Sequence, residues 1–268
     1  MEWIHVFVLA VIQGLTEFLP VSSSAHLILP SQLLGWPDQG LAFDVGVHVG
    51  TLIAVVFYFR VDVWAMLCAF FNSVRGQQSI EGKTAWFIIG ATIPALISGF
   101  LLHDFIDQYG RSLLVIAGAT MIFGALLWFA DTRDNPQKSL SELTFKQSLF
   151  IGCAQAIALI PGTSRSGITM TAALMAGFSR DAAAKFSFYL SIPIILAAGS
   201  YKGLGLASSD VVVRWDMVMS GVVLSALVAF ACIHYFLIWL EKVGMLPFVI
   251  YRFVLGLVLL AVYFSRSV

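Results

Sequence analysis

Ionisable and hydroxyl side chains gather in two short segments of a 268-residue chain whose residues are 59% hydrophobic. The first segment carries Glu17, three consecutive serines at 22–24 and His26, and the second carries Arg165 in a loop rich in serine and glycine. A charge at the centre of a bilayer costs about 2.5–3.5 kcal/mol even on a lenient scale, so incidental placement is unfavourable. Arginine, hydroxyls and free helix N-termini together are typical of a site for an oxyanion such as phosphate.

Each of these residues also has a structural interpretation. Glu17 and Arg165 can form a buried ion pair that clamps the two segments together, although such pairs often add little stability. His26 can be a satisfied structural histidine. Ser23, Ser24 and Ser164 can cap helices. The residue types alone leave these alternatives open.

Other polar residues and the cysteines are expected to have structural roles. Asp44 and His48 are four residues apart, so they lie on one face of a helix and could line the cavity, but a helix-start cap and an intrahelical contact explain them. Arg252 can extend its side chain to the membrane interface. The three cysteines have no C-x-x-C spacing and are predicted to be small core residues: Cys68, Cys153 and Cys232.

Composition indicates an all-α polytopic membrane protein. Charged residues make up 11% of the chain, against about 25% in soluble domains, and mean hydropathy is +0.91. Apolar stretches of about 19 residues match the roughly 30 Å hydrocarbon layer, whereas β-barrel strands would be alternating segments of about ten residues. Fifteen basic residues balance fifteen acidic ones, so net charge predicts no nucleic-acid partner. The expected partner is the lipid bilayer.

The apolar pattern predicts six spanning helices and two helical hairpins too short to cross the membrane. The hairpins are expected at 3–35 and 145–178, where Pro20 and Pro161 interrupt short apolar stretches. We expect these hairpins to enter from opposite faces and to meet with their serine loops near the middle. The predicted spans are 43–60, 84–103, 112–131, 183–201, 215–240 and 247–265.

A weak internal repeat supports this arrangement. Gln13, Pro20 and Ser23 align with Gln155, Pro161 and Ser164, with one residue fewer between the Gln and the Pro in the second copy. Paired, interrupted short hydrophobic segments are the sequence sign of inverted repeats with a site at the membrane midplane. We therefore predict a single membrane domain, 1–268, made of a first inverted repeat at 1–131, a cytoplasmic linker at 132–146 and a second inverted repeat at 147–268.

Basic residues are distributed asymmetrically across the predicted topology. With both termini outside, four basic residues fall in outer segments, namely Arg111, Lys202, Arg214 and Arg266. Nine fall in cytoplasmic segments, namely Arg60, Arg75, Lys83, Arg133, Lys138, Lys146, Arg180, Lys185 and Lys242. This distribution obeys the positive-inside rule and predicts that the N- and C-termini lie outside.

Two motifs carry a resemblance to a known family. The segment from Gln13 to His26 reads Gln-Gly-Leu-Thr-Glu-Phe-Leu-Pro-Val-Ser-Ser-Ser-Ala-His, and the segment from Pro161 to Thr169 reads Pro-Gly-Thr-Ser-Arg-Ser-Gly-Ile-Thr. Together they resemble the undecaprenyl-diphosphate phosphatases, the bacitracin-resistance phosphatases of bacterial inner membranes. The resemblance covers essentially the whole chain in length, motif separation and hydropathy.

The resemblance implies hydrolysis of undecaprenyl diphosphate to the monophosphate, which recycles the lipid carrier of cell-wall synthesis. It implies a multi-pass protein of the bacterial cytoplasmic membrane with a polyprenyl diphosphate substrate, and it leaves open whether two copies form a homodimer. The family's E/Q-x-x-x-E motif falls on Gln13 and Glu17, so only one carboxylate remains there. Members are similar in needing a divalent cation, here Mg²⁺ or Ca²⁺, for which Glu17 is the expected ligand.

The predicted mechanism gives each motif residue a role. Arg165 neutralises the phosphates, Glu17 holds the metal, Ser23 attacks or positions the terminal phosphoryl group, and His26 carries a proton or is itself the nucleophile. The expected substrate-binding residues are Gln13, Ser22, Ser24, Gly162, Thr163, Ser164, Ser166, Gly167 and Thr169.

An alternative function follows from the inverted repeat alone. A flippase for polyprenyl phosphate or an anion transporter would need the arginine and the loop amides but no nucleophile.

Overall fold

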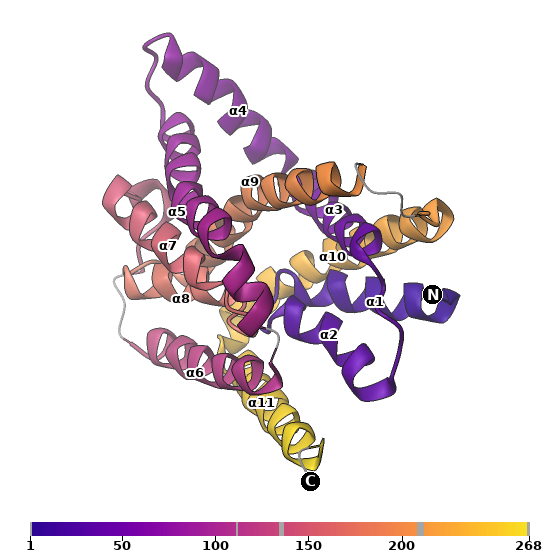
Figure 1. The fold of residues 1–268 in the computed structure, drawn as a ribbon. Helices are drawn as coiled ribbons and strands as arrows, with labels where there is room; N and C mark the ends of the chain where they lie inside the picture. Colours follow the sequence, from indigo (N-terminus) through magenta and orange to yellow (C-terminus); the bar gives the residue numbers. More distant parts are fainter. Residues whose placement is uncertain (1, 111, 134–136, 208–211, 267–268) are drawn as a thin grey trace.

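The computed structural model describes residues 2–110, 112–133, 137–207 and 212–266, and the described part of the chain is built from helices (Figure 1). Eleven α-helices and one short 3₁₀ helix, η1 (Leu140–Glu142), follow one another in these residues. The α-helices are α1 (Trp3–Thr16), α2 (Ser23–Leu34), α3 (Leu41–Tyr58), α4 (Arg60–Val74), α5 (Ile80–Tyr109), α6 (Leu113–Asp131), α7 (Phe145–Ile157), α8 (Arg165–Met175), α9 (Arg180–Ala207), α10 (Trp215–Val243) and α11 (Leu246–Arg266).

Six of these helices are long and apolar enough to cross a membrane, which confirms the predicted number of spans. They are α3, α5, α6, α9, α10 and α11. Only 22–56% of the residues in their most apolar windows are buried inside the protein. Large hydrophobic side chains therefore cover much of the outer surface, which suits contact with lipid and would be unusual on a monomeric soluble protein.

Four of the five remaining α-helices form two hairpins at the predicted places, and the fifth, α4, lies between α3 and α5 in the chain. Hairpin 1 consists of α1, loop 1 (residues 17–22) and α2, and hairpin 2 consists of α7, loop 2 (residues 158–164) and α8. These helices have 11–14 residues, so each rises only about 17–21 Å, less than the hydrocarbon thickness. In Figure 1, α1 packs on α10 while α7 packs on α5, so each hairpin is supported by a long helix of the other half.

The two loops end in the same local structure. Ser22 and Ser164 precede α2 and α8 with positive φ angles of 75° and 71°, which non-glycine residues rarely adopt. In each loop, the serine hydroxyl lies 3.2 Å from that of the serine two residues later. The alignment of Ser23 with Ser164 is therefore wrong by one residue: Ser22 is the structural counterpart of Ser164, because the backbone at the helix start sets the match.

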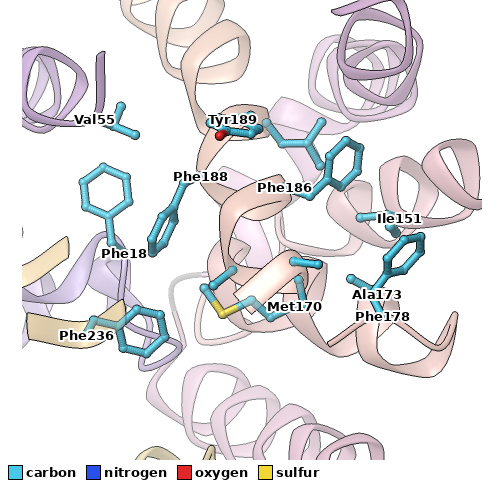
Figure 2. Packing of buried hydrophobic residues seen from close by; sticks show 14 of the residues in the cluster. Phe18, Val55, Ile151, Met170, Ala173, Phe178, Phe186, Phe188, Tyr189 and Phe236 are labelled. Carbon is cyan, nitrogen blue, oxygen red and sulfur yellow. The ribbon is translucent and has the colours of Figure 1, made fainter. Parts of the chain in front are cut away.

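Aromatic residues anchor loop 1 to the protein core. Phe18 is fully buried, and its ring meets Phe188 edge-to-face, with centroids 5.2 Å apart at 82° (Figure 2). Phe188 in α9 also approaches Phe236 of α10 at 5.9 Å. Such pairs contribute about 0.5–1.5 kcal/mol beyond their area burial. The neighbour of Glu17 is thus held in the core, which fixes where Glu17 points.

The linker between the halves is tied to hairpin 2. Lys138 N–H donates to Gly177 O at 3.0 Å, and Ser179 N–H donates to Lys138 O at the same distance. At η1, Ser139 N–H donates to Glu142 Oε2, and this hydrogen bond lowers the pKa of the exposed Glu142 carboxyl below its ordinary value. Helix α7 begins at Phe145, inside the stretch assigned to the linker.

The expectation for the cysteines is correct only for Cys232, which is buried in α10. Cys68 and Cys153 are exposed. A small apolar residue is as compatible with a lipid-facing position as with the core, so apolar surroundings in the sequence do not distinguish the two.

The predicted topology makes a labelling prediction. A cysteine at exposed Asp38, before α3, should react with an impermeant thiol reagent from outside intact cells, and one at exposed Ser141, in the linker, should react only after the membrane is opened. The three native cysteines should be replaced first to lower the background. Labelling of both sites from the same side would contradict the opposed hairpins.

Candidate active site

A cavity of about 220 Å³ lies where the two loops meet. One side is polar and comes from the loops and the starts of α2 and α8. The rest of the lining comes from α3, which contributes two polar residues, and mainly from α9, which is apolar there except for Lys202. The lining residues are Glu17, Ser22, Ser23, Ser24, Asp44, Val45, His48, Ala158, Ser164, Arg165, Ile194, Ile195, Ala198, Gly199 and Lys202.

Glu17 is the centre of the hydrogen bonds in this cavity. Its Oε2 accepts from Ser23 Oγ and from Gln13 Nε2, both at 2.9 Å, and its Oε1 accepts from Arg165 Nη2 at 3.0 Å. His48 Nε2 lies 3.8 Å from Oε2. Because Glu17 is only 8% exposed, these donors replace water around the carboxylate. The carboxylate is thereby fixed against the Ser23 hydroxyl.

Arg165 joins the two halves of the chain at this point. Its partner Glu17 is 148 residues away in sequence, and its Nη1 donates to Ser187 O of α9 at 2.9 Å. A guanidinium has five N–H donors, and these two hydrogen bonds leave three for another acceptor. The ion pair that was the structural alternative for Glu17 and Arg165 is therefore present. Arg165 also has N–H groups left over that can donate to an anion.

The starts of α2 and α8 present further donors. Ser164 Oγ accepts from Gly167 N–H at 3.1 Å, whereas Ser22 makes no such side-chain cap. Within the described residues, the backbone N–H groups of Ser23, Ser24 and Arg165 have no acceptor. Free N–H groups at helix starts, with the positive end of the helix dipole, favour bound anions.

Several predicted site residues lie behind the cavity and shape the loops instead. Ser166 Oγ donates to Leu19 O at 2.8 Å, which ties α8 to loop 1. Gly162 has a φ angle of 94°, which glycine adopts at no steric cost. The predicted residues absent from the lining are Gln13, His26, Gly162, Thr163, Ser166, Gly167 and Thr169.

The structure does not bring His26 into the cavity, contrary to the expectation. His26 Nδ1 lies 2.7 Å from Ser22 O, and Nε2 lies 2.6 Å from the hydroxyl of Tyr251 in α11. A carbonyl only accepts, so Nδ1 donates and Nε2 accepts from the tyrosine in a neutral ring. The imidazole turns away because both its nitrogens find partners behind loop 1. The catalytic role of His26 stays a prediction.

Three further charged or ionisable residues line the cavity: Asp44, His48 and Lys202. The intrahelical contact expected for the first two is present, with His48 Nδ1 2.7 Å from Asp44 O, and Asp44 also accepts from Gln39 Nε2. Their spacing of four residues was the signal that they share a face. Lys202 carried no such signal, because it belongs to a different helix, α9.

Arg252 is not at a membrane interface, so the expectation that its side chain extends there is wrong. The residue is completely buried, and its guanidinium donates to backbone carbonyls of both loops. The sequence signal was the charge itself within an apolar helix, which marks a functional candidate more often than an interfacial one.

The cavity offers few side-chain ligands for a metal ion. Among the described residues, no group of three His, Cys, Asp or Glu side chains could hold a metal ion. Glu17 already accepts three hydrogen bonds, and Asp44 is the other carboxylate of the cavity. Mg²⁺ commonly binds one or two carboxylates together with substrate phosphates. The residues therefore fit a cation shared with a phosphate ligand, and not one held by protein alone.

The fold defines a polytopic membrane protein with a cavity where two interrupted hairpins meet. The family model described as bacitracin resistance protein BacA matches residues 6–258. The chain belongs to this family.

Curated relatives match over nearly their whole length. A protein of Chromohalobacter salexigens named undecaprenyl-diphosphatase is 58% identical over 261 residues, covering 97% of this chain and 98% of the relative. One of Saccharophagus degradans with the same name is 57% identical over 256 residues, covering 96% of each. Undecaprenyl-diphosphatase 1 of Pseudoalteromonas translucida is 58% identical over 257 residues, covering 96% of this chain and 97% of the relative.

The geometry of Arg165 leads to a prediction about anion binding. Arg165→Lys keeps the charge and can still pair with Glu17, but it loses the planar fork that binds two oxygens. If Arg165 contacts the anion, inorganic phosphate should bind about tenfold more weakly or worse, as for one lost charge-assisted hydrogen bond. Calorimetry on detergent-purified protein at matched folded concentration measures this affinity. A phosphate affinity within about twofold of wild type would show that Arg165 only forms the ion pair with Glu17.

Proposed function

We propose that this chain hydrolyses undecaprenyl diphosphate to undecaprenyl phosphate and inorganic phosphate. One observation carries the proposal: Glu17, Ser23 and Arg165, from loops far apart in sequence, meet at one cavity beside two helix N-termini. The family match and the names of the relatives support the same substrate. The reaction recycles the lipid carrier of cell-wall synthesis and accounts for bacitracin resistance.

In the proposed first step, Ser23 attacks the terminal phosphorus. Glu17 Oε2 accepts the hydroxyl proton, for which it is already placed at 2.9 Å. The Oγ–P bond forms, the bridging P–O bond breaks, and undecaprenyl phosphate leaves with the electron pair. Arg165 and the free N–H groups of the helix starts stabilise the charge on the transferring group.

In the second step, water attacks the phosphoserine. The Oγ–P bond breaks, the proton held by Glu17 returns to Ser23, and inorganic phosphate leaves with both protons of the water. A direct attack by water on the diphosphate, with Ser23 only positioning it, is the alternative. His26, bound to Ser22 O, is proposed to hold loop 1 in place rather than to carry the proton.

The apolar wall of the cavity suits the lipid part of the substrate. This apolar lining consists of Ile194, Ile195, Ala198 and Gly199 of α9 together with Val45 of α3. A Cβ built on Gly199 would have no heavy atom within 4 Å, so there is open space beside this helix. We propose that the polyprenyl chain leaves the cavity sideways here, between α3 and α9, into the bilayer.

We also propose the cellular placement. The protein lies in the bacterial cytoplasmic membrane with both termini outside, which the positive-inside distribution supports. The two halves are inverted repeats, each with a re-entrant hairpin, which is supported by the matched serines before α2 and α8.

Phosphate release from undecaprenyl diphosphate by purified protein in liposomes tests the proposed function. Wild type should release one phosphate per substrate, and Ser23→Ala should lower the single-turnover rate by about 10³-fold or more if Ser23 is the nucleophile. Ser31→Ala, two turns further along α2 and outside the cavity, is the matched control.

Other outcomes are informative as well. Translocation of polyprenyl phosphate by wild type without phosphate release would favour the transporter alternative. A phosphatase that Ser23→Ala slows less than about tenfold would favour direct attack by water.

A divalent cation, Mg²⁺ or Ca²⁺, is proposed to bind between Glu17 and the substrate phosphates, where it would supply positive charge to their oxygens. Glu17→Gln removes both the proton acceptor and the expected ligand, so it should lower turnover and raise the metal concentration that gives the half-maximal rate. The metal dependence of phosphate release measures this, with Gln13→Glu expected to be tolerated. Full turnover of Glu17→Gln with an unchanged metal requirement would remove the ligand role.

A further inference from the structure

Arg252 in α11 is a buried cation held by backbone carbonyls alone. Its Nε donates to Thr120 O at 2.9 Å and its Nη1 to Pro20 O at 3.3 Å. Its Nη2 donates to Gly162 O at 3.0 Å and to Thr163 O at 2.9 Å. Within the described residues, no carboxylate lies at ion-pair distance from it. Arginine stays protonated in proteins, so this site holds a whole positive charge out of water.

The charges around the cavity show why this cation matters. Arg165 is paired with Glu17, so the two together bring no net charge. Asp44 and Lys202 both line the cavity and carry opposite formal charges, so this pair also adds no net charge. The uncompensated positive charge beside the loops therefore belongs to Arg252.

We propose that Arg252 supplies the net positive charge that holds a diphosphate anion in the cavity, and that it acts through the peptide unit between Thr163 and Ser164 in loop 2. It is a positioning residue, because the loops separate it from the cavity. A trans peptide directs its C=O and N–H to opposite sides, so holding Thr163 O directs the N–H of Ser164 away from Arg252. Ser164 lines the cavity, and this N–H has no backbone acceptor among the described residues.

The space for the guanidinium is reserved by two glycines. A Cβ built on Gly167 would lie 2.8 Å from Arg252 Nη1, and one built on Gly124 would lie 3.3 Å from Arg252 Cβ. Gly167 also donates its N–H to Ser164 Oγ, so the same turn of α8 contacts both the guanidinium and the cavity serine. The Arg252 guanidinium therefore lies against the same first turn of α8 that contacts Ser164 of the cavity.

Two variants separate the charge from the hydrogen bonds. Arg252→Lys keeps the charge but cannot reach four carbonyls, and Arg252→Gln keeps two N–H donors but has no charge. The measurement is the dissociation constant of inorganic pyrophosphate, by calorimetry on the folded fraction of detergent-purified protein. We expect it to rise at least about tenfold in Arg252→Gln and to stay within about threefold in Arg252→Lys. Arg180→Gln, which breaks a bidentate pair with Asp131 elsewhere, is the control for lost stability alone.

Two results would overturn the proposal. Pyrophosphate affinity within about threefold of wild type in folded Arg252→Gln would show that Arg252 only stabilises the conformation of the loops. An equal loss in both variants would show that the hydrogen bonds and not the charge are needed. The inference rests on the anion site of the proposed function, but pyrophosphate binding is measured without turnover. A wild type that binds pyrophosphate and releases no phosphate from lipid would count only against the proposed function.

Discussion

Backbone polar groups without water must find partners inside the protein, and that constraint governs this structure. Two loops interrupt helices between apolar neighbours, so their carbonyls need donors. Arg252 supplies donors to three loop carbonyls, and Ser166 supplies one to Leu19 O. The loops are therefore held by side chains from other segments. Thr163 O and Ser22 O are held in this way by Arg252 and His26, and the N–H groups that follow them, those of Ser164 and Ser23, have no acceptor among the described residues.

The ion pair between Glu17 and Arg165 has a structural role and also a role in the proposed chemistry. The pair of Glu17 and Arg165 joins the two halves, as a structural role requires. It also fixes the carboxylate beside Ser23 and aims a guanidinium with spare donors into the cavity. A planar group with five donors can serve both roles, whereas an ammonium would use its single charge centre for one. One ion pair can thus serve the structural role and the proposed chemical role together.

Phosphoryl transfer needs positioning and charge compensation more than covalent chemistry from the protein. This cavity supplies both with few groups. A hydroxyl lies against a fixed carboxylate, free N–H groups line the starts of α2 and α8, and an apolar wall on α9 suits a lipid chain. In the proposed function, the polar residues of this cavity bind the phosphate end of the substrate, and the apolar residues of α9 bind its lipid end.

The sequence by itself determined the class, the six spans and the two short hairpins, because hydropathy and helix length are local properties. It also identified Glu17, Ser23 and Arg165, since charges and hydroxyls in apolar surroundings are costly and therefore informative. Only the tertiary structure decided that His26 faces Tyr251, that Lys202 reaches the cavity and that Arg252 binds both loops. These depend on partners far away in the chain and on the backbone at Ser22 and Ser164, and no local pattern encodes the direction of a side chain.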